Sequence, residues 1–457
     1  MRRPISNGVT ATVAFAVSLS MAACGGGGSS VSPDPAPADP VPGAAQLTTV
    51  LQADGITAQP AVPTVSDELF ALGSALFFDK ILSGNHDVSC ATCHWPELAA
   101  ADERTLPRGV GGGATLGANR ATGSIVPRNS PSVLNAHLLV RLFHDGRIEI
   151  DGADLDTPAG AAFTPAMRSV FDPRWELLAA QALFPVTSRE EMRGQNGQNP
   201  LANLGDADFT GIWDGLRDRL VAFTAYQDLF LAAYPSLSGI GEIEFAHAAN
   251  AIAAFEVRAF ARTDSAFERF VGGDDQALTE EQVRGALAFY AGNSCARCHS
   301  GRAFTDNDFH NIGLPQFGPG KGDGGSGLDD FGRERVTGQG GQRYRFRTAS
   351  LLNIELTAPY GRLGQYDDLR SMVLHYTDTA QSLQNYSILD NVTDVDLIGT
   401  LLANTNDIST RISNRVRNPR NFDVDAVVAF LQSLTADSAR DLSALIPAAV
   451  PSGLPVR

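Results

Sequence analysis

CATCH (Cys90–His94) and CARCH (Cys295–His299) are two copies of one short pattern, and they determine how the rest of the chain is interpreted. Two thiols three residues apart on a helical turn can each bond a vinyl group of one haem, and the histidine that follows can hold its iron. With five cysteines and eight histidines in 457 residues, chance predicts about 0.001 such motifs. A zinc site would need converging ligands, whereas these pairs stand roughly 200 residues apart, each with its own histidine. The sequence therefore predicts two covalently bound c-type haems, attached at Cys90, Cys93, Cys295 and Cys298, with His94 and His299 as axial ligands.

An amphipathic helix is expected before each motif. Residues 66–79 (SDELFALGSALFFD) and 279–292 (TEEQVRGALAFYAG) both carry an apolar stripe at helical spacing, and the second opens with a Thr-x-x-Gln capping box. Residues 243–270 predict a long helix between the motifs, and residues 424–437 predict a final one. The connecting loops are long and rich in glycine. We predict a mainly α fold of two cytochrome c-like haem domains with long loops and few short strands.

The N-terminal segment is typical of an export signal. Arg2 and Arg3 precede a mostly apolar run, and small residues lead to Cys24. This pattern predicts a signal peptide over 1–23, a periplasmic location and a lipid on Cys24. The alternative is a soluble periplasmic protein that has lost Cys24. No later segment is long and apolar enough to span a bilayer, so membrane attachment is expected only through that lipid.

The rest of the chain divides at the two haem motifs. A Gly- and Pro-rich start predicts a flexible tether over 24–62, followed by an N-terminal haem domain (63–275), a C-terminal haem domain (276–440) and a tail (441–457). The net charge of −16 argues against a nucleic-acid surface and allows basic soluble partners. The oligomeric state stays open, a dimer included.

Several segments together carry a family resemblance. They are LGSALFFDKILSGNHDVSCATCH (72–94), PRNSPSVLNA (127–136), LFHDGRIE (142–149), FPVTSREEM (184–192), FTDNDFHNIGLP (304–315) and FRTASLLNIELTAPYGRLGQYDDLRSMVLHY (346–376). In this order and spacing they resemble the bacterial dihaem cytochrome c peroxidase and MauG-type superfamily, over roughly residues 65–435.

The resemblance implies a peroxidatic N-terminal haem and an electron-transfer C-terminal haem. Hydrogen peroxide would meet the iron held by His94, and electrons would come from a small periplasmic cytochrome c or cupredoxin. The family's acid–base catalyst maps onto Glu191, with Gln181 as a polar partner on the same wall. A buried carboxyl with a raised pKa suits proton transfer between the peroxide oxygens. Without the resemblance, Glu190 and Glu191 would be interpreted as a pair of solvated carboxylates.

Two departures from the family pattern affect the expected chemistry. The loop after the first motif, ADERTLPRGVGGGATLGANR (101–120), contains no histidine, which predicts an iron that is open without prior reduction. His144 stands where the family usually has a tryptophan between the haems, and imidazole is much harder to oxidise than indole. Direct tunnelling between the haems is one alternative, and substitution by Trp95 or Trp175 is another, although packing is the simpler role for both.

The resemblance also places the sixth ligand of the second iron and a calcium ion. Counting 17 residues from Pro359 reaches Tyr376, where MauG-type enzymes have a tyrosine and peroxidases have a methionine. The alternatives for this sixth ligand are His375, Met372 or no ligand at all. The family's bridging calcium maps onto the side chain of Asn129 and the backbone carbonyls of Thr357 and Pro359.

The sequence thus predicts an exported dihaem oxidoreductase that reduces hydrogen peroxide to water. One alternative is a MauG-type enzyme that oxidises a protein or organic substrate through a bis-ferryl state, which Tyr376 and the missing distal histidine favour. The other is a non-enzymatic dihaem electron-transfer lipoprotein, and Gln181 and Glu191 argue against it because an electron carrier needs no distal acid.

Overall fold

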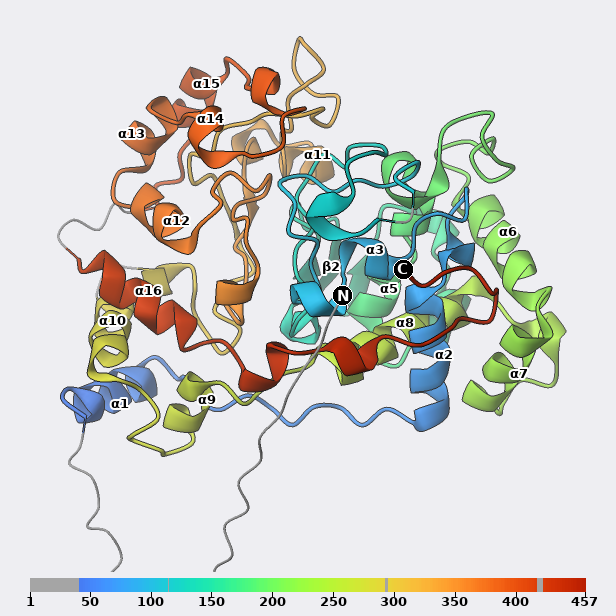
Figure 1. Ribbon diagram of the computed structural model, residues 1–457, viewed down its shortest axis with the longest axis horizontal. Coiled ribbons are helices and arrows are strands. Elements are labelled where there is room, and N and C mark those ends of the chain that lie inside the picture. The colour runs from blue at the N-terminus through green and yellow to red at the C-terminus, as the bar shows by residue number, and fades with distance from the viewer. Residues whose placement is uncertain (1–40, 114, 292–294, 417–421) are drawn as a thin grey trace, which may run out of the picture. The chain divides into compact units, whose positions relative to one another are not determined.

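The computed structural model describes residues 41–113, 115–291, 295–416 and 422–457 (Figure 1). The expected signal peptide over 1–23, Cys24 and the first part of the expected tether lie outside these residues. The described residues form mostly helices, and their strands are few and short, which confirms the predicted fold class. Within the same part of the chain, no helix combines the length and the apolar content needed to cross a bilayer.

The α-helices of the described residues are short to medium in length, and 3-10 turns join many of them. In chain order they are α1 (Ala44–Ala53), α2 (Asp67–Phe78), α3 (Cys90–Cys93), α4 (Pro165–Val170), α5 (Glu176–Ala182), α6 (Phe209–Val221), α7 (Thr224–Ala233), α8 (Phe245–Phe260), α9 (Ala266–Val271), α10 (Glu280–Tyr290), α11 (Glu334–Thr337), α12 (Leu369–His375), α13 (Thr379–Gln384), α14 (Ile388–Asn391), α15 (Thr405–Thr410) and α16 (Val424–Gln432).

The strands make two small antiparallel sheets. The first has the order β1 (Arg141–Leu142), β2 (Ile148–Asp151) and β3 (Asp154–Asp156). The second pairs β4 (Phe309–His310) with β5 (Phe346–Arg347), so that Phe309 lies opposite Arg347. This second sheet joins the loop after CARCH to the segment that begins FRTAS.

Two helix pairs cross at a glycine. A Cβ atom on Gly73 of α2 would lie 2.0 Å from the carbonyl oxygen of Ala251 in α8. A Cβ atom on Gly285 of α10 would lie 1.8 Å from the carbonyl oxygen of Ala426 in α16. Because each glycine presents only a hydrogen atom, the two backbones of each pair touch. The helix expected before each haem motif therefore packs directly on a helix that comes later in the chain.

Two large apolar clusters surround these helix pairs. The first contains α2, α5 and α8, and it also takes in Leu442 and Val450 from the C-terminal segment. The second contains α9, α10 and α16, and it takes in Leu47 and Leu51 from α1. In Figure 1, α1 accordingly lies beside α10. Each cluster thus includes residues from the opposite end of the chain.

Two expectations differ from the structure. Residues 41–62 were expected to belong to a flexible tether, yet α1 forms there, since Leu47 and Leu51 lie one turn apart and are buried against the second cluster. The single helix expected over 243–270 ends at Phe260 and resumes as α9. The segment between the two helices instead forms an antiparallel bridge from Ser265 to Ala436. Tertiary contacts stabilise a helix in the first place and override local helix propensity in the second.

Candidate haem sites

The first haem motif begins as a single helical turn. Ser89 precedes α3 and its backbone N–H donates to the Thr92 hydroxyl at 2.9 Å, which closes a capping box. The turn brings Cys90 and Cys93 to the same side, and His94 follows directly. The Nδ1–H of His94 donates to the carbonyl of Ala100 at 3.3 Å, and burial lowers the pKa of this imidazole to about 4. The ring is therefore neutral near pH 7, with Nε2 free to bind iron.

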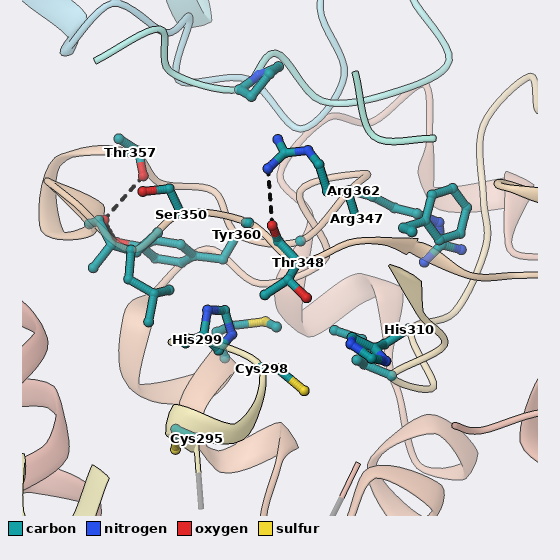
Figure 2. Close-up of a pocket in the computed structure, with 18 of the residues that line it drawn as sticks. Cys295, Cys298, His299, His310, Arg347, Thr348, Ser350, Thr357, Tyr360 and Arg362 are labelled. Atoms are coloured by element: carbon teal, nitrogen blue, oxygen red, sulfur yellow. Dashed lines mark hydrogen bonds between the residues drawn. The ribbon is translucent and has the colours of Figure 1, made fainter. Parts of the chain in front are cut away.

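The second motif repeats this arrangement. Figure 2 shows His299 beside Cys298. His299 donates from Nδ1 to the carbonyl of Phe304 at 3.0 Å, and burial lowers the pKa of its imidazole. Ala100 and Phe304, whose carbonyls accept these bonds, both have a positive φ, of 54° and 50°. The same local device therefore fixes the tautomer and the orientation of both histidines.

A second repeated element supports the two histidines. SVLN (Ser132–Asn135) and SLLN (Ser350–Asn353) each end in a buried asparagine with a left-handed backbone, at φ 57° and 60°. The carbonyls of Pro131 and Ala349, just before these segments, raise the pKa values of His94 and His299 against the effect of burial. The Nδ2–H of Asn353 donates to the Asn135 side-chain oxygen at 3.1 Å.

The loops behind the two histidines therefore meet at one amide pair. No chemical role for Asn135 and Asn353 is expected from the haem motifs alone. The shared Ser-x-Leu-Asn pattern, at a similar place after each haem motif, is the signal that could have found them.

A cavity of about 290 Å³ lies next to the second motif. Its wall includes Cys295, Cys298 and His299 together with Tyr376, and much of the remaining surface is apolar. The lining residues include three arginines and no aspartate or glutamate among the described residues. An apolar cavity with two thiols, a neutral histidine and cationic side chains fits a haem, which is a flat apolar ring that carries two carboxylates.

The candidates for the sixth ligand of the second iron separate by position. Tyr376 caps the C-terminal end of α12, and both it and Met372 line the cavity. Burial raises the pKa of the Tyr376 phenol, with smaller contributions from Cys295 and Cys298. His375 is engaged elsewhere, because its Nε2–H donates to the Ile312 carbonyl at 2.7 Å and its Nδ1 accepts from the Tyr366 hydroxyl at 3.0 Å. Of the alternatives, this geometry disfavours His375.

Glu191 lies near the first motif, on the π-helical turn Arg189–Arg193. Burial raises the pKa of its carboxyl, although the cations of Arg147 and Lys321 oppose this shift. Glu191 is close enough to Cys93 to raise the pKa of that thiol, after the larger effect of burial and that of Asp102. Glu191 is therefore a half-buried carboxyl with a raised pKa on the side of the first motif.

The glycine-rich loop after the first motif packs on this turn. A Cβ atom on Gly109 would lie 1.9 Å from the carbonyl oxygen of Glu190, so only glycine allows this approach. Arg120, which is buried, donates to the carbonyls of Arg108 at 2.6 Å and Gly109 at 2.8 Å. Gln181 lies at the end of α5, and no hydrogen bond joins its side chain to Glu191 among the described residues. The loop thus fixes Glu191 through backbone contacts.

The residue expected between the haems, and the two tryptophans that could replace it, form hydrogen bonds within the protein. His144 lines the cavity of the second motif, and its Nε2–H donates to the carbonyl of Asn129 at 3.0 Å. Burial lowers the pKa of His144 to about 4, so the ring is neutral. Trp95 donates to Glu97 at 3.0 Å, and Trp175 donates to Asn250 at 2.9 Å. Both indoles are buried in the first apolar cluster, as a packing role requires.

The residues expected to bind calcium all line the same cavity. Asn129 donates from Nδ2 to the carbonyls of Arg104 at 2.7 Å and Thr105 at 3.3 Å, which leaves its side-chain oxygen available. No N–H of the described residues donates to the carbonyls of Thr357 or Pro359. Three available neutral oxygens fit a hard cation in donor type. Since no carboxylate joins them, such a site would bind the ion weakly.

His310 forms a separate polar group beside Cys298. Its Nε2–H donates to Asp306 at 3.1 Å. Burial alone would lower the pKa of His310, but Asp306 and Cys298 outweigh it and raise the value to about 9. The ligand atoms of Cys298, Asp306 and His310 lie within 4.8 Å of one another. A thioether at Cys298 would remove its thiolate, so this trio fits a haem edge better than a separate metal ion.

Comparisons with known proteins agree with this geometry. A family model described as di-haem cytochrome c peroxidase matches residues 67–276. The methylamine utilization protein MauG of Methylorubrum extorquens is 32% identical over 317 residues, which cover 69% of this chain and 70% of that protein. The cytochrome c551 peroxidase of Pseudomonas aeruginosa is 30% identical over 314 residues, which cover 68% of this chain and 71% of that protein.

Solved structures give the same picture of the fold. A MauG-like protein associated with microbial copper homeostasis is 26% identical, with a TM-score of 0.57, and the match covers 84% of this chain and 94% of that one. The diheme peroxidase BthA from Burkholderia thailandensis is 20% identical, with a TM-score of 0.52, and the match covers 83% and 89% of the two chains. The relatives thus include peroxidases and MauG proteins at similar identity.

Proposed function

The chain belongs to the di-haem cytochrome c peroxidase and MauG family, and on this basis we propose that it reduces hydrogen peroxide to water. Membership of a di-haem family implies two c-type haems. We assign the first to Cys90, Cys93 and His94, and the second to Cys295, Cys298 and His299. When bound, the first haem supplies the iron at which the O–O bond is cleaved.

The observation that carries the proposal is the environment of Glu191. The carboxyl of Glu191 is partly exposed and lies near Arg147 and Lys321, and its pKa is raised because desolvation outweighs the opposing effect of those two cations. Glu191 can therefore take the proton from one peroxide oxygen and return it to the other, so that the leaving oxygen departs as water. With two electrons and two protons, one peroxide gives two waters.

The electrons would come from a one-electron donor such as a small cytochrome c or a cupredoxin. They would enter through the half of the chain that carries Cys295 and His299. The net charge of −16 suits a basic donor. The loop over 101–120 contains no histidine to bind the first iron, so the ferric protein should react without prior reduction.

A variant at Glu191 tests the proposal. Glu191→Gln keeps the size of the side chain but cannot carry a proton between the oxygens. We expect kcat/KM for peroxide, measured with a reduced donor cytochrome, to fall roughly 100- to 10,000-fold. Glu190→Gln is the matched control, since it removes a neighbouring carboxylate that has no role in the proposed proton transfer. Equal rates for the two variants would remove Glu191 from the mechanism.

A second function is favoured by one specific observation, the position of Tyr376 in the cavity wall. An axial phenolate stabilises ferric iron and lowers its potential, which suits an enzyme that oxidises a protein or organic substrate. Peroxide added to the ferric protein without any donor distinguishes the two functions. A long-lived oxidised spectrum that decays only when an organic substrate is added would favour the MauG-type activity.

We also propose that the protein is exported and held at a membrane by a lipid on Cys24. The apolar run before Cys24 and the Gly- and Pro-rich segment after it support this. Cys24→Ser should move the protein from the membrane fraction to the soluble periplasmic fraction.

We propose weak calcium binding at Asn129, Thr357 and Pro359, which metal analysis before and after a chelator would test.

A further inference from the structure

Two arginines lie in the wall of the second cavity without an acidic partner. Arg347 makes its hydrogen bonds to backbone carbonyls, to Phe143 at 3.4 Å and to Thr348 at 3.1 Å. Arg362 is 7% exposed, and its contacts to the carbonyls of Leu314 and Pro315 are long, at 3.5 and 3.4 Å. The Nε of Arg362 has no hydrogen-bond partner among the described residues.

The nearby acidic groups already form ion pairs with another arginine, Arg128. Asp330 is the carboxylate that faces Arg362, but it accepts two hydrogen bonds of 2.8 Å from Arg128. Asp145 is also held by Arg128, at 2.7 Å. Burial lowers the pKa values of Arg347 and Arg362 to about 10, which still leaves both side chains charged near neutral pH. One buried and one half-buried positive charge, Arg362 and Arg347, without counter-ions are unfavourable, so the cavity is built for an anionic ligand.

The position of the two guanidinium groups matches one ligand. Figure 2 shows Arg347 and Arg362 on the far side of the cavity from Cys295. In a c-type haem the thioether bonds are made at one edge of the ring, and the two propionates project from the opposite edge. From this placement we propose that Arg347 and Arg362 bind the propionate carboxylates of the haem attached at Cys295 and Cys298. The proposal rests on that attachment, which the proposed function includes.

The propionate edge then faces the N-terminal half of the chain. The backbone N–H of Arg347 donates to the carbonyl of His144 at 2.8 Å, and the N–H of Asn129 donates to the carbonyl of Arg362 at 2.8 Å. The two arginines thus hold the haem carboxylates against the segments that also carry the expected calcium ligand Asn129. They set the charge at this edge of the second haem.

The charge of the two arginines should raise the reduction potential of the second haem. A positive group beside an ionised propionate offsets the negative charge that an added electron brings. Without the positive group, a propionate buried in an apolar cavity has a raised pKa. Protonation of that propionate is then coupled to reduction of the haem. The other titratable or charged groups that face this cavity are His144, His299, His310, Tyr344, Tyr360, Tyr376 and Arg415, together with the two haem-attaching cysteines, and none of them is changed in the test.

Spectroelectrochemical titration of the holoprotein at pH 5 to 9 tests the proposal. In Arg347→Gln and in Arg362→Gln, the midpoint potential of the second haem should fall below that of the unaltered protein, and it should decrease as pH rises. The unaltered protein should show a flatter pH profile. Arg370→Gln is the matched control, because Arg370 is an exposed arginine of the nearby α12 that pairs with Asp425.

Identical potentials and pH profiles in the two glutamine variants and in Arg370→Gln would overturn the proposal. If a glutamine variant does not fold with both haems attached, Arg362→Lys provides a second test. Lysine keeps the positive charge, so the midpoint potential of the second haem in Arg362→Lys should stay close to that of the unaltered protein. If this potential fell as far as is expected for complete loss of the charge, the role of charge would be contradicted. A haem count by the pyridine haemochrome assay is independent of these results. One haem in the unaltered protein would mean that the proposed function, and not the arginine assignment, has failed.

Discussion

Histidines take different roles in this chain because their ring nitrogens have different partners. His94 and His299 each donate from Nδ1 to a backbone carbonyl, which leaves Nε2 for iron. His375 uses both nitrogens within the protein, and His144 uses Nε2 to bind the Asn129 carbonyl. Sequence spacing cannot distinguish these cases, since each depends on which carbonyl the fold brings to the ring.

The tyrosine at the second cavity gives a prediction at the same scale. Tyr376→Phe removes the phenol oxygen and keeps the aromatic ring in the cavity wall. We expect the ferric low-spin signal of the second haem in low-temperature electron paramagnetic resonance to be replaced by a high-spin signal. Met372→Leu is the control, because Met372 lines the same cavity one turn earlier. If Met372→Leu changed the signal and Tyr376→Phe did not, methionine would be the ligand.

Glu256 gives a prediction about pH. It is a buried residue of α8, and burial raises the pKa of its carboxyl from the ordinary 4.5 to about 8. The folded state therefore holds this proton more tightly than the unfolded state, and folding loses stability as pH rises from 4.5 towards 8. The loss should be about 4 kcal/mol at pH 8 and about 1 kcal/mol at pH 5.

Glu256→Gln removes this titration. Its melting temperature should exceed that of the unaltered protein at pH 8, and the difference should shrink at pH 5. Differential scanning calorimetry at the two pH values measures this. A difference that is the same at both values would mean that Glu256 does not titrate between them.

At the scale of elements, the two halves of the chain share a helix crossing at a glycine. The helix before each haem motif packs on a later helix by the same close contact, α2 on α8 and α10 on α16. Gly73→Ala and Gly285→Ala should each lower the free energy of unfolding by roughly 2–4 kcal/mol, because the backbone contact outweighs a helix-propensity gain of about 1 kcal/mol. Chemical denaturation monitored by circular dichroism measures the change.

Gly215→Ala in α6 is the matched control for the glycine variants. Its Cβ would approach only the end of the Leu201 side chain, which can move aside. This variant should be neutral or slightly stabilising. Losses of the same size at all three glycines would show that the helix crossings are not the cause.

The elements close to the haem motifs follow from the sequence, and those shaped by distant contacts do not. Ser66 caps α2, and Thr279 and Gln282 close the capping box of α10, as their local patterns predict. The break after Phe260 depends on contacts with the segment around Ala436, which no local pattern records. Similarly, the cysteines and histidines of the two motifs are evident from spacing. The repeated Ser-x-Leu-Asn pattern marks Asn135 and Asn353, but only the fold shows that their side chains bond to each other.

At the scale of the whole molecule, each apolar cluster is completed from the other end of the chain. α1 packs into the second cluster, and the segment around Leu442 and Val450 packs into the first. The bond between Asn135 and Asn353 joins the loops behind the two axial histidines. Both motifs lie in one compact unit of the chain. Such an arrangement suits the electron delivery that we propose, from the second motif to the first.

The measurement that tests this account most directly is the stoichiometry of donor oxidation. Ferric protein as purified, without prior reduction, is mixed with a reduced donor cytochrome and a limiting amount of hydrogen peroxide. We expect about two donor molecules to be oxidised for each peroxide consumed, because reduction of one peroxide to two waters takes two electrons. Donor oxidation no faster than in the absence of the protein would contradict it.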